Sequence, residues 1–289
     1  HQIRNENESL GQWEISKDNL DQMQVIFNEP SDNALNATMT RFWNSWQSLA
    51  QNPQGSANRA SLREQASSLT ASFNHLWDQL AVIQRDTNDQ RSLKVQEINS
   101  YASRIASLNG QISVVQLSGN QANDLKDQRD LLVDNLSKKI NITQQEMSNG
   151  SVTITVGGNP LVFGNATTQI VAQFNTDPVP LTLVNPAFGR IYDVKWADDS
   201  STVTVSNGEL KGLLDTRDSV LPQKVAHLND LAGGIITSVN SDHQQGVGLH
   251  DHDVANIGAG GGGSVSPVHT AAGGRCGGGG SAVKCKGVC

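Results

Sequence analysis

The sequence predicts a mainly α-helical protein with a β-rich insertion, an α+β fold in which an elongated helical bundle or coiled-coil-like rod carries a small β domain. Apolar residues recur every three or four positions through residues 1–141 and again through 209–249, which indicates amphipathic helices. Residues 142–208 contain short runs in which apolar and polar residues alternate, as in half-buried strands. Residues 250–289 are glycine-rich and lack any periodicity, which predicts a disordered or non-native tail.

The first helix is expected to present one apolar face. Its apolar residues are spaced by three and seven positions, and the face comprises Leu10, Trp13, Leu20 and Phe27, with Met23 beside them. Pro30 ends this helix, because proline restricts the backbone of the residue before it and has no N–H to continue the helical bonding.

The second helix carries most of an aromatic group. Only 4% of the residues are aromatic, yet Phe27, Phe42, Trp43 and Trp46 all fall between residues 27 and 53. Phe42 and Trp46 share one heptad stripe with Leu35, Met39 and Leu49, so we predict that they pack in a helical core. Trp43 lies one position off that stripe, and we predict contact with a third helix or another subunit. A carbohydrate- or cofactor-binding box is the alternative.

A long helix is expected from about Ala57 to Leu117, followed by a shorter one that ends near Ile140. In the long helix, apolar residues recur at alternating steps of four and three. This stripe contributes further predicted core residues, among them Leu69, Phe73, Leu76 and Leu80. The stripe turns polar near residue 87 and resumes one residue late at Ile98, which predicts bending or a change of partner around residues 85–97.

Five or more short strands are expected in the β-rich insertion. The candidates are the runs 152–156, 161–163, 170–174, 181–184, 192–196 and 203–205. Helix is expected to resume near Glu209, with Pro222 either beginning a new helix or kinking this one.

Two arginines are expected to be structural. Arg129 falls on the apolar stripe of its helix, between Leu125 and Leu132. A buried or half-buried arginine needs carboxylate partners, so we predict ion pairs for Arg129 and for Arg217.

Composition limits the classes of partner. The net charge of −7 argues against binding to nucleic acid, and no run of 18 apolar residues is present, so we expect no membrane insertion. The three cysteines, Cys276, Cys285 and Cys289, all fall in the tail.

No catalytic or cofactor-binding residue is predicted, and we expect that the protein is not an enzyme. The zinc-protease, nucleophile-elbow and P-loop motifs are all missing from the sequence. The candidate metal ligands are His243, His250 and His252, within the run His243 to Asp253. Because their segment lacks the rigid elements that hold a metal site, we expect no functional metal there.

Several segments together resemble one known family, the flagellar hook-associated protein 1 or hook–filament junction family. They are FNEPSDNALNATMTRFWNSWQSLAQNP, EINSYASRIASLNGQI, NDLKDQRDLLVDNLSKKINI, LKGLLDTRDSVLPQKVAHLNDLA and VNSDHQQGVGL. The resemblance covers about residues 1–249. It implies that the terminal segments of the family are missing and that the tail is foreign.

The resemblance implies a structural component of the bacterial flagellum, a secreted protein of motility that leaves the cell by type III export without a cleaved signal peptide. The implied partners are the hook protein, the second hook–filament junction protein and other copies of itself in a ring. Without the family's terminal segments we expect this chain to be a monomer. The alternatives are a flagellar surface-binding module or adhesin that uses the β domain, and an enzyme or metal site near residues 243–253.

Overall fold

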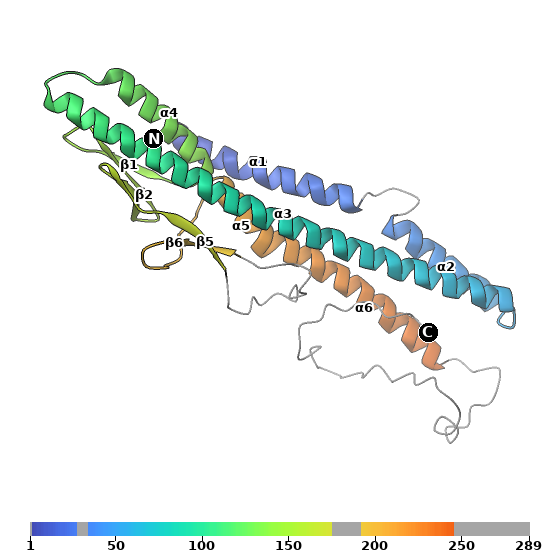
Figure 1. Cartoon of the computed structure of the whole chain (residues 1–289). Coiled ribbons are helices and arrows are strands. Elements are labelled where there is room, and N and C mark those ends of the chain that lie inside the picture. Colours follow the sequence, from blue (N-terminus) through green and yellow to red (C-terminus); the bar gives the residue numbers. More distant parts are fainter. Residues whose placement is uncertain (1, 28–33, 175–191, 246–289) are drawn as a thin grey trace. The chain divides into compact units, whose positions relative to one another are not determined.

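The computed structural model describes residues 2–27, 34–174 and 192–245 (Figure 1). Its helices are α1 (Gln2–Phe27), α2 (Leu35–Gln51), α3 (Ser56–Leu117), α4 (Asn123–Lys139), α5 (Glu209–Asp215) and α6 (Leu221–Gln245), with a π-helical turn, η2 (Thr216–Val220), before α6. The strands are β1 (Thr143–Glu146), β2 (Val152–Val156), β3 (Asn159–Phe163), β4 (Ala166–Thr167), β5 (Ile170–Phe174) and β6 (Tyr192–Trp196). The predicted fold class, mainly helical with a β-rich insertion, is confirmed. The tail at 250–289 and the expected strand at 181–184 lie outside the described residues.

The described residues form two compact units. The first contains residues 2–27, 77–174 and 192–225, and the second contains residues 34–76 and 226–245. These units do not follow the sequence boundaries at 141/142 and 208/209, because α3 and α6 each contribute to both units.

The β region of the first unit consists of two antiparallel sheets. Strands β1 to β4 form one sheet in sequential order, and β5 pairs with β6 in the other. The run 203–205 was expected to be a strand, and that prediction is wrong: only Thr202 makes a bridge, to Lys195. Val203 still donates a backbone hydrogen bond to Val194 at 3.0 Å, so the segment is held against β6 without becoming a strand.

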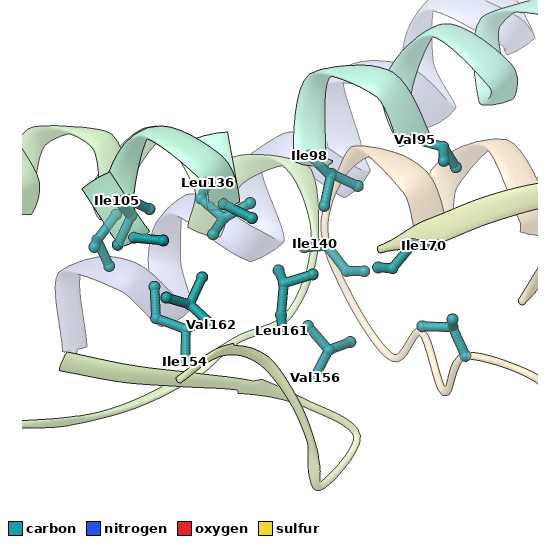
Figure 2. Close-up of a cluster of buried hydrophobic side chains, with 14 of the residues drawn as sticks. Val95, Ile98, Ile105, Leu136, Ile140, Ile154, Val156, Leu161, Val162 and Ile170 are labelled. Atoms are coloured by element: carbon teal, nitrogen blue, oxygen red, sulfur yellow. The ribbon is translucent and has the colours of Figure 1, made fainter. Parts of the chain in front are cut away.

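The core of the first unit lies between helices and sheet. Figure 2 shows Ile98 and Ile105 of α3 and Leu136 of α4 on one side, with Ile154, Leu161 and Val162 of the sheet on the other. All six side chains are fully or almost fully buried. Burying such aliphatic side chains contributes about 1.5–3 kcal/mol each, which makes this cluster a main source of the unit's stability.

Helix α1 does not bury the apolar face that its sequence suggested. Met23 is buried as expected, but Leu10, Trp13 and Leu20 are exposed. The buried side carries Glu8, Gly11 and Asn19 instead. The reason is specific contact: α1 packs on α4 and α5, where a small or hydrogen-bonding residue fits better than a large apolar one.

Gly11 is the point of closest approach in that packing. A Cβ at this position would collide with the backbone carbonyl oxygen of Lys138 on α4. Gly212 on α5 has the same role, because its Cβ would lie 2.9 Å from the carbonyl oxygen of Gln12. The backbone of α1 therefore touches that of α4 at Gly11 and that of α5 at Gly212.

The second unit contains the aromatic helix. In α2, Phe42 and Ser45 are buried, while Leu35, Met39 and Trp46 are half-buried. The first part of α3 and the last part of α6 bury their own apolar residues in this unit, namely Leu69, Phe73, Leu76, Leu228, Ile235 and Val239. In the first unit, Pro222 is the second residue of α6 and directly follows the π-helical turn η2, through which the helical backbone continues from α5.

Candidate functional site

Three asparagines on α3 bind the backbone of the β region. Buried Asn109 donates through Nδ2 to the carbonyl oxygens of Val152 and Gly164, both at 2.8 Å. Its Oδ1 accepts from the Val152 N–H at 3.0 Å. Asn99 makes the same two-way contact with Ile170, donating at 2.7 Å and accepting at 3.0 Å. A side-chain amide carries the donor and acceptor of a peptide group, so each asparagine pairs with a strand as a neighbouring strand would.

The third asparagine belongs to a cluster around the first residue of β6. Oδ1 of Asn88 accepts from the Tyr192 N–H at 3.2 Å. The guanidinium groups of Arg91 and Arg217 both donate to the Tyr192 carbonyl oxygen, at 2.7 and 3.1 Å. Arg217 also pairs with Asp193 at 2.8 Å and with its neighbour Asp218. The backbone N–H and C=O of one residue, Tyr192, are therefore held by an amide and by two cations.

Burial of Arg91, together with the nearby charge of Arg217, lowers its pKa to about 10, although Asp218 and Asp193 act in the opposite direction. For Arg217, burial also acts to lower the pKa, but its hydrogen bonds and charge interactions with Asp218 and Asp193 outweigh burial and hold the pKa above its ordinary value. The carboxylates are what make two adjacent guanidinium groups tolerable at this position.

A second charged group joins α3, α4 and α5. The ammonium of Lys94 lies 2.8 Å from the Glu209 carboxylate and 3.2 Å from that of Glu97. The ammonium of Lys139 lies 2.9 Å from Glu209 and 3.2 Å from Glu97. Glu209 is buried, so its charge needs both lysines to compensate for lost hydration.

The network shifts the pKa values of its more accessible members in opposite directions. Burial acts to raise the pKa of Glu97, but the hydrogen bonds from Lys94 and Lys139 outweigh it and lower the pKa. Burial acts to lower the pKa of Lys139, but Glu209 and Glu97 outweigh it and raise the pKa. The Glu97 contribution to stability is therefore present above its ordinary pKa of about 4.3 and is lost as the pH falls through the folded-state value. The Lys139 contribution is fully present below about 10.4 and is lost as the pH rises through its folded-state value.

The change Glu209→Gln is expected to lower the free energy of unfolding by about 2 kcal/mol near pH 7, because two lysines lose their shared carboxylate. Urea unfolding followed by circular dichroism measures the change. The difference from wild type should shrink as the pH rises through the raised pKa of Lys139, because the deprotonated amine no longer needs the carboxylate. Glu146→Gln is the matched control, since Glu146 pairs with Lys126 at the surface and such pairs contribute at most about 1 kcal/mol. Equal losses in the two variants would contradict the assigned role of Glu209.

Glu8 connects α1 to the short segment between α4 and β1. Its Oε1 accepts from the Ile142 N–H at 2.9 Å, and its backbone carbonyl accepts from Gly208 at 3.1 Å. Burial raises the pKa of Glu8, partly offset by the bond from Ile142. Both ends of the β region, at residues 142 and 208, are thus fixed to one residue of α1.

The structure places the two predicted arginine ion pairs as follows. Arg129 is buried on α4, pairs with Asp130 at 3.2 Å and donates to the Gly150 carbonyl oxygen at 2.7 Å. Arg217 has the partners described above. Each arginine therefore has a carboxylate neighbour, and each also binds a backbone carbonyl of the β region, which the sequence did not suggest.

The predicted aromatic residues occupy different environments. The ring of Phe42 packs edge-on against Trp43, with centroids 5.0 Å apart, and against Trp46, with centroids 6.4 Å apart. Trp43 is 38% exposed, so part of its ring remains free for an outside contact. Phe27 is half-buried at the end of α1 in the first unit. Leu80 is fully buried in the first unit, on α3.

The candidate metal ligands are not brought together within the described residues. His250 and His252 lie outside them, as does the side chain of His243. In the part of the chain that is described, no cluster of three or more His, Cys, Asp or Glu side chains could hold a metal ion. The helices of that part are also too short or too polar to cross a membrane.

Sequence reasoning missed Asn99 and Asn109. The signal available was position: each follows directly after an apolar stripe residue, Ile98 or Leu108, and so stands at the edge of the buried face. Asparagine is unfavourable inside helices, so an asparagine at the edge of a buried face indicates a tertiary hydrogen bond.

Comparison with known proteins gives a consistent result. The sequence model of the flagellar hook-associated protein FlgK helical domain matches residues 20–257. Flagellar hook-associated protein 1 of Bacillus subtilis is 27% identical, in an alignment that covers 94% of this chain and 57% of the relative. Flagellar hook-associated protein 1 of Salmonella typhimurium is 31% identical, in an alignment that covers 78% of this chain and 41% of the relative. The chain thus spans about half the length of these relatives. The comparisons do not support the surface-binding alternative.

The fold agrees with the same family. The structure of the flagellar hook junction protein FlgK from Burkholderia pseudomallei superposes with a TM-score of 0.63 at 26% identity, covering 82% of this chain and 43% of that one. With helices, β insertion and sequence all matching, the chain belongs to the flagellar hook-associated protein FlgK family, whose helical domain it contains.

Proposed function

We propose that this chain is a structural, non-enzymatic part of the junction between flagellar hook and filament, and that it acts outside the cell. The match to the family's helical domain over residues 20–257 carries the proposal. Its partners would be the hook protein on one side, the second junction protein on the other, and further copies of itself.

The internal contacts suit a part that must carry mechanical load. The β region is attached to α3 at three separate points along the helix, through Asn88, Asn99 and Asn109. Hydrogen bonds and ion pairs are directional, so they resist sliding of sheet against helix, which apolar packing alone resists less. A mechanical load on α3 would be transmitted to the β region without the strands sliding along the helix.

A domain exchange tests the proposal. The segment of the Salmonella typhimurium protein that aligns with this chain is replaced by this chain's residues, and the chimera is expressed in a strain without its own junction protein. We expect attached filaments, seen by electron microscopy, and recovery of swimming on soft agar. A chimera that is recovered from the culture fluid but leaves the filaments detached would count against the proposal.

A further inference from the structure

The helical backbone contains one residue too many for an α-helix between α5 and α6. At the end of α5 the N–H of Thr216 donates to the carbonyl oxygen of Gly212, four residues back, as in any α-helix. At the start of α6 the N–H of Leu221 donates to the carbonyl oxygen of Thr216, five residues back. Asp215, Thr216 and Leu221 all have helical φ and ψ, so the helix continues through η2 with a one-residue offset.

The offset decides which side of α6 continues the buried side of α5. Successive residues of an α-helix turn by about 100°, so an unbroken helix would place Leu221 above Arg217 on one face. With the π-helical turn, Leu221 lies above Thr216, and Thr216 lies above Gly212. These three residues are buried, whereas the side chain of Arg217 reaches Asp193 of β6. The offset therefore separates a charged residue from an apolar one that α-helical spacing would stack together.

Contacts on both sides of η2 fix this arrangement. Before the turn, the Thr216 hydroxyl accepts from Nδ2 of Asn19 on α1 at 3.0 Å. Within the turn, Arg217 is bound to β6 as described above. After the turn, Leu221 and Val225 bury their side chains almost completely in the first unit. The rotation of α5 and that of α6 are thus fixed independently, and η2 contains the residue by which they differ.

Pro222 disfavours a helix without the offset. Inside an unbroken α-helix, a proline ring collides with the carbonyl oxygen of the residue four positions back, which here is Asp218, and its missing N–H removes a helical bond. The five-residue turn η2 ends with the bond from Leu221, directly before the proline, so the turn needs no N–H from Pro222.

We propose that η2 is a conformational device, a one-residue offset that sets the rotation of α6 about its own axis, and that Pro222 protects it by destabilising the unbroken α-helix. The offset and unbroken forms differ by about 100° in the rotation of α6 relative to α5. In the unbroken form Leu221 would turn toward β6 beside Arg217, and the buried row would end at Thr216. The inference concerns the conformation of this helix and does not depend on the proposed function.

Deletion of one residue from η2 tests the proposal, because removing the offset should leave the rotation of α6 unchanged. Ser219 is exposed, and without it the bond from Leu221 to Thr216 spans four residues, as in an α-helix. Pro222 then stands inside an unbroken helix, so the deletion is combined with Pro222→Ala. This double variant should melt within ~3 °C of wild type. Circular dichroism gives the melting temperature, and hydrogen exchange assigns any loss to the first unit.

Deletion of Ser103 is the matched control. Ser103 is also an exposed serine in a helix of the first unit, but it lies in α3 close to buried Ala102 and Ile105, where no offset is present. Its deletion should lower the melting temperature by more than ~10 °C or abolish the cooperative transition, because it rotates one part of α3 by about 100° against the other. Deletion of Ser219 with Pro222 retained should fall between, ~5–10 °C below wild type.

The variants separate the two parts of the proposal. A double variant that loses as much stability as the Ser103 deletion would overturn the offset. A double variant no more stable than the Ser219 deletion alone would overturn the role of Pro222. A crystal structure of the double variant gives a direct check, since Leu221 should donate to Thr216 while Arg217 remains paired with Asp193. Rotation of α6, with Arg217 released from Asp193, would contradict the proposal.

Discussion

Gly11→Ala is expected to destabilise the first unit by about 2 kcal/mol, although alanine is the better helix former. In an exposed helix the same change stabilises by about 1 kcal/mol. Here the new Cβ would collide with the backbone carbonyl oxygen of Lys138, and backbone cannot rotate away as a side chain can. Overpacking of this kind costs typically 1–3 kcal/mol, and α1 would have to move away from α4.

The matched control is Gly233→Ala in α6, where an added Cβ meets nothing within 4 Å. That variant should be as stable as wild type or up to about 1 kcal/mol more stable. Urea unfolding gives the free energies, and hydrogen exchange assigns the loss to α1 and α4, which matters because two units need not unfold together. If Gly11→Ala gained stability like the control, the close packing of α1 on α4 would be wrong.

The periodicity of the sequence was sufficient for the class of fold and for most helices. The stripe from Leu62 through Ile112 predicted a helix from about residue 57 to 117, and α3 runs over Ser56–Leu117. Strands with clear alternation, such as Val152–Val156, were also predicted from pattern alone. Strands β1 and β4 were missed, because TQQE and AT contain no alternation and are paired only through their neighbours.

Periodicity could not decide which side of a helix is buried. In α1 most large apolar residues face outward. The packed side instead carries Gly11 and Glu8, which fit there because of the groups that they contact. The close approach of Gly11 to Lys138 and the hydrogen bond of Glu8 to Ile142 depend on the tertiary structure, and no local sequence pattern predicts them. The boundary between the two compact units at Trp77 lies within the continuous helix α3, and no local pattern predicts it for the same reason.

The attachment of the β region was equally hidden. Asparagine in a helix predicts a hydrogen bond but not its partner, and the partners lie 43 to 104 residues away along the chain. The arginine pairs were easier, because a charge on an apolar stripe needs a counter-charge wherever the chain folds. Their second partners, the carbonyl oxygens of Gly150 and Tyr192, are backbone groups and carry no sequence signal.

Asn109→Leu is expected to lower the free energy of unfolding of the first unit by about 3 kcal/mol or more. Leucine has the same number and branching of side-chain heavy atoms, so its shape is similar, but three hydrogen bonds to buried backbone are lost. A buried polar group left without its partner costs about 1–3 kcal/mol, and Val152 loses the partner of both its N–H and its carbonyl. Hydrogen exchange followed by mass spectrometry should show faster exchange in β2 and β3, with α2 unchanged.

Asn135→Leu makes the same chemical change at an exposed position on α4 and should shift stability by no more than about 0.5 kcal/mol. Asn99→Leu should fall between the two, since Asn99 is half-buried and makes two bonds to Ile170. This order of losses, Asn109 above Asn99 above Asn135, follows from burial and bond count together. If all three variants lost the same stability, the sheet would be held to α3 by apolar packing, and the asparagines would contribute only their volume.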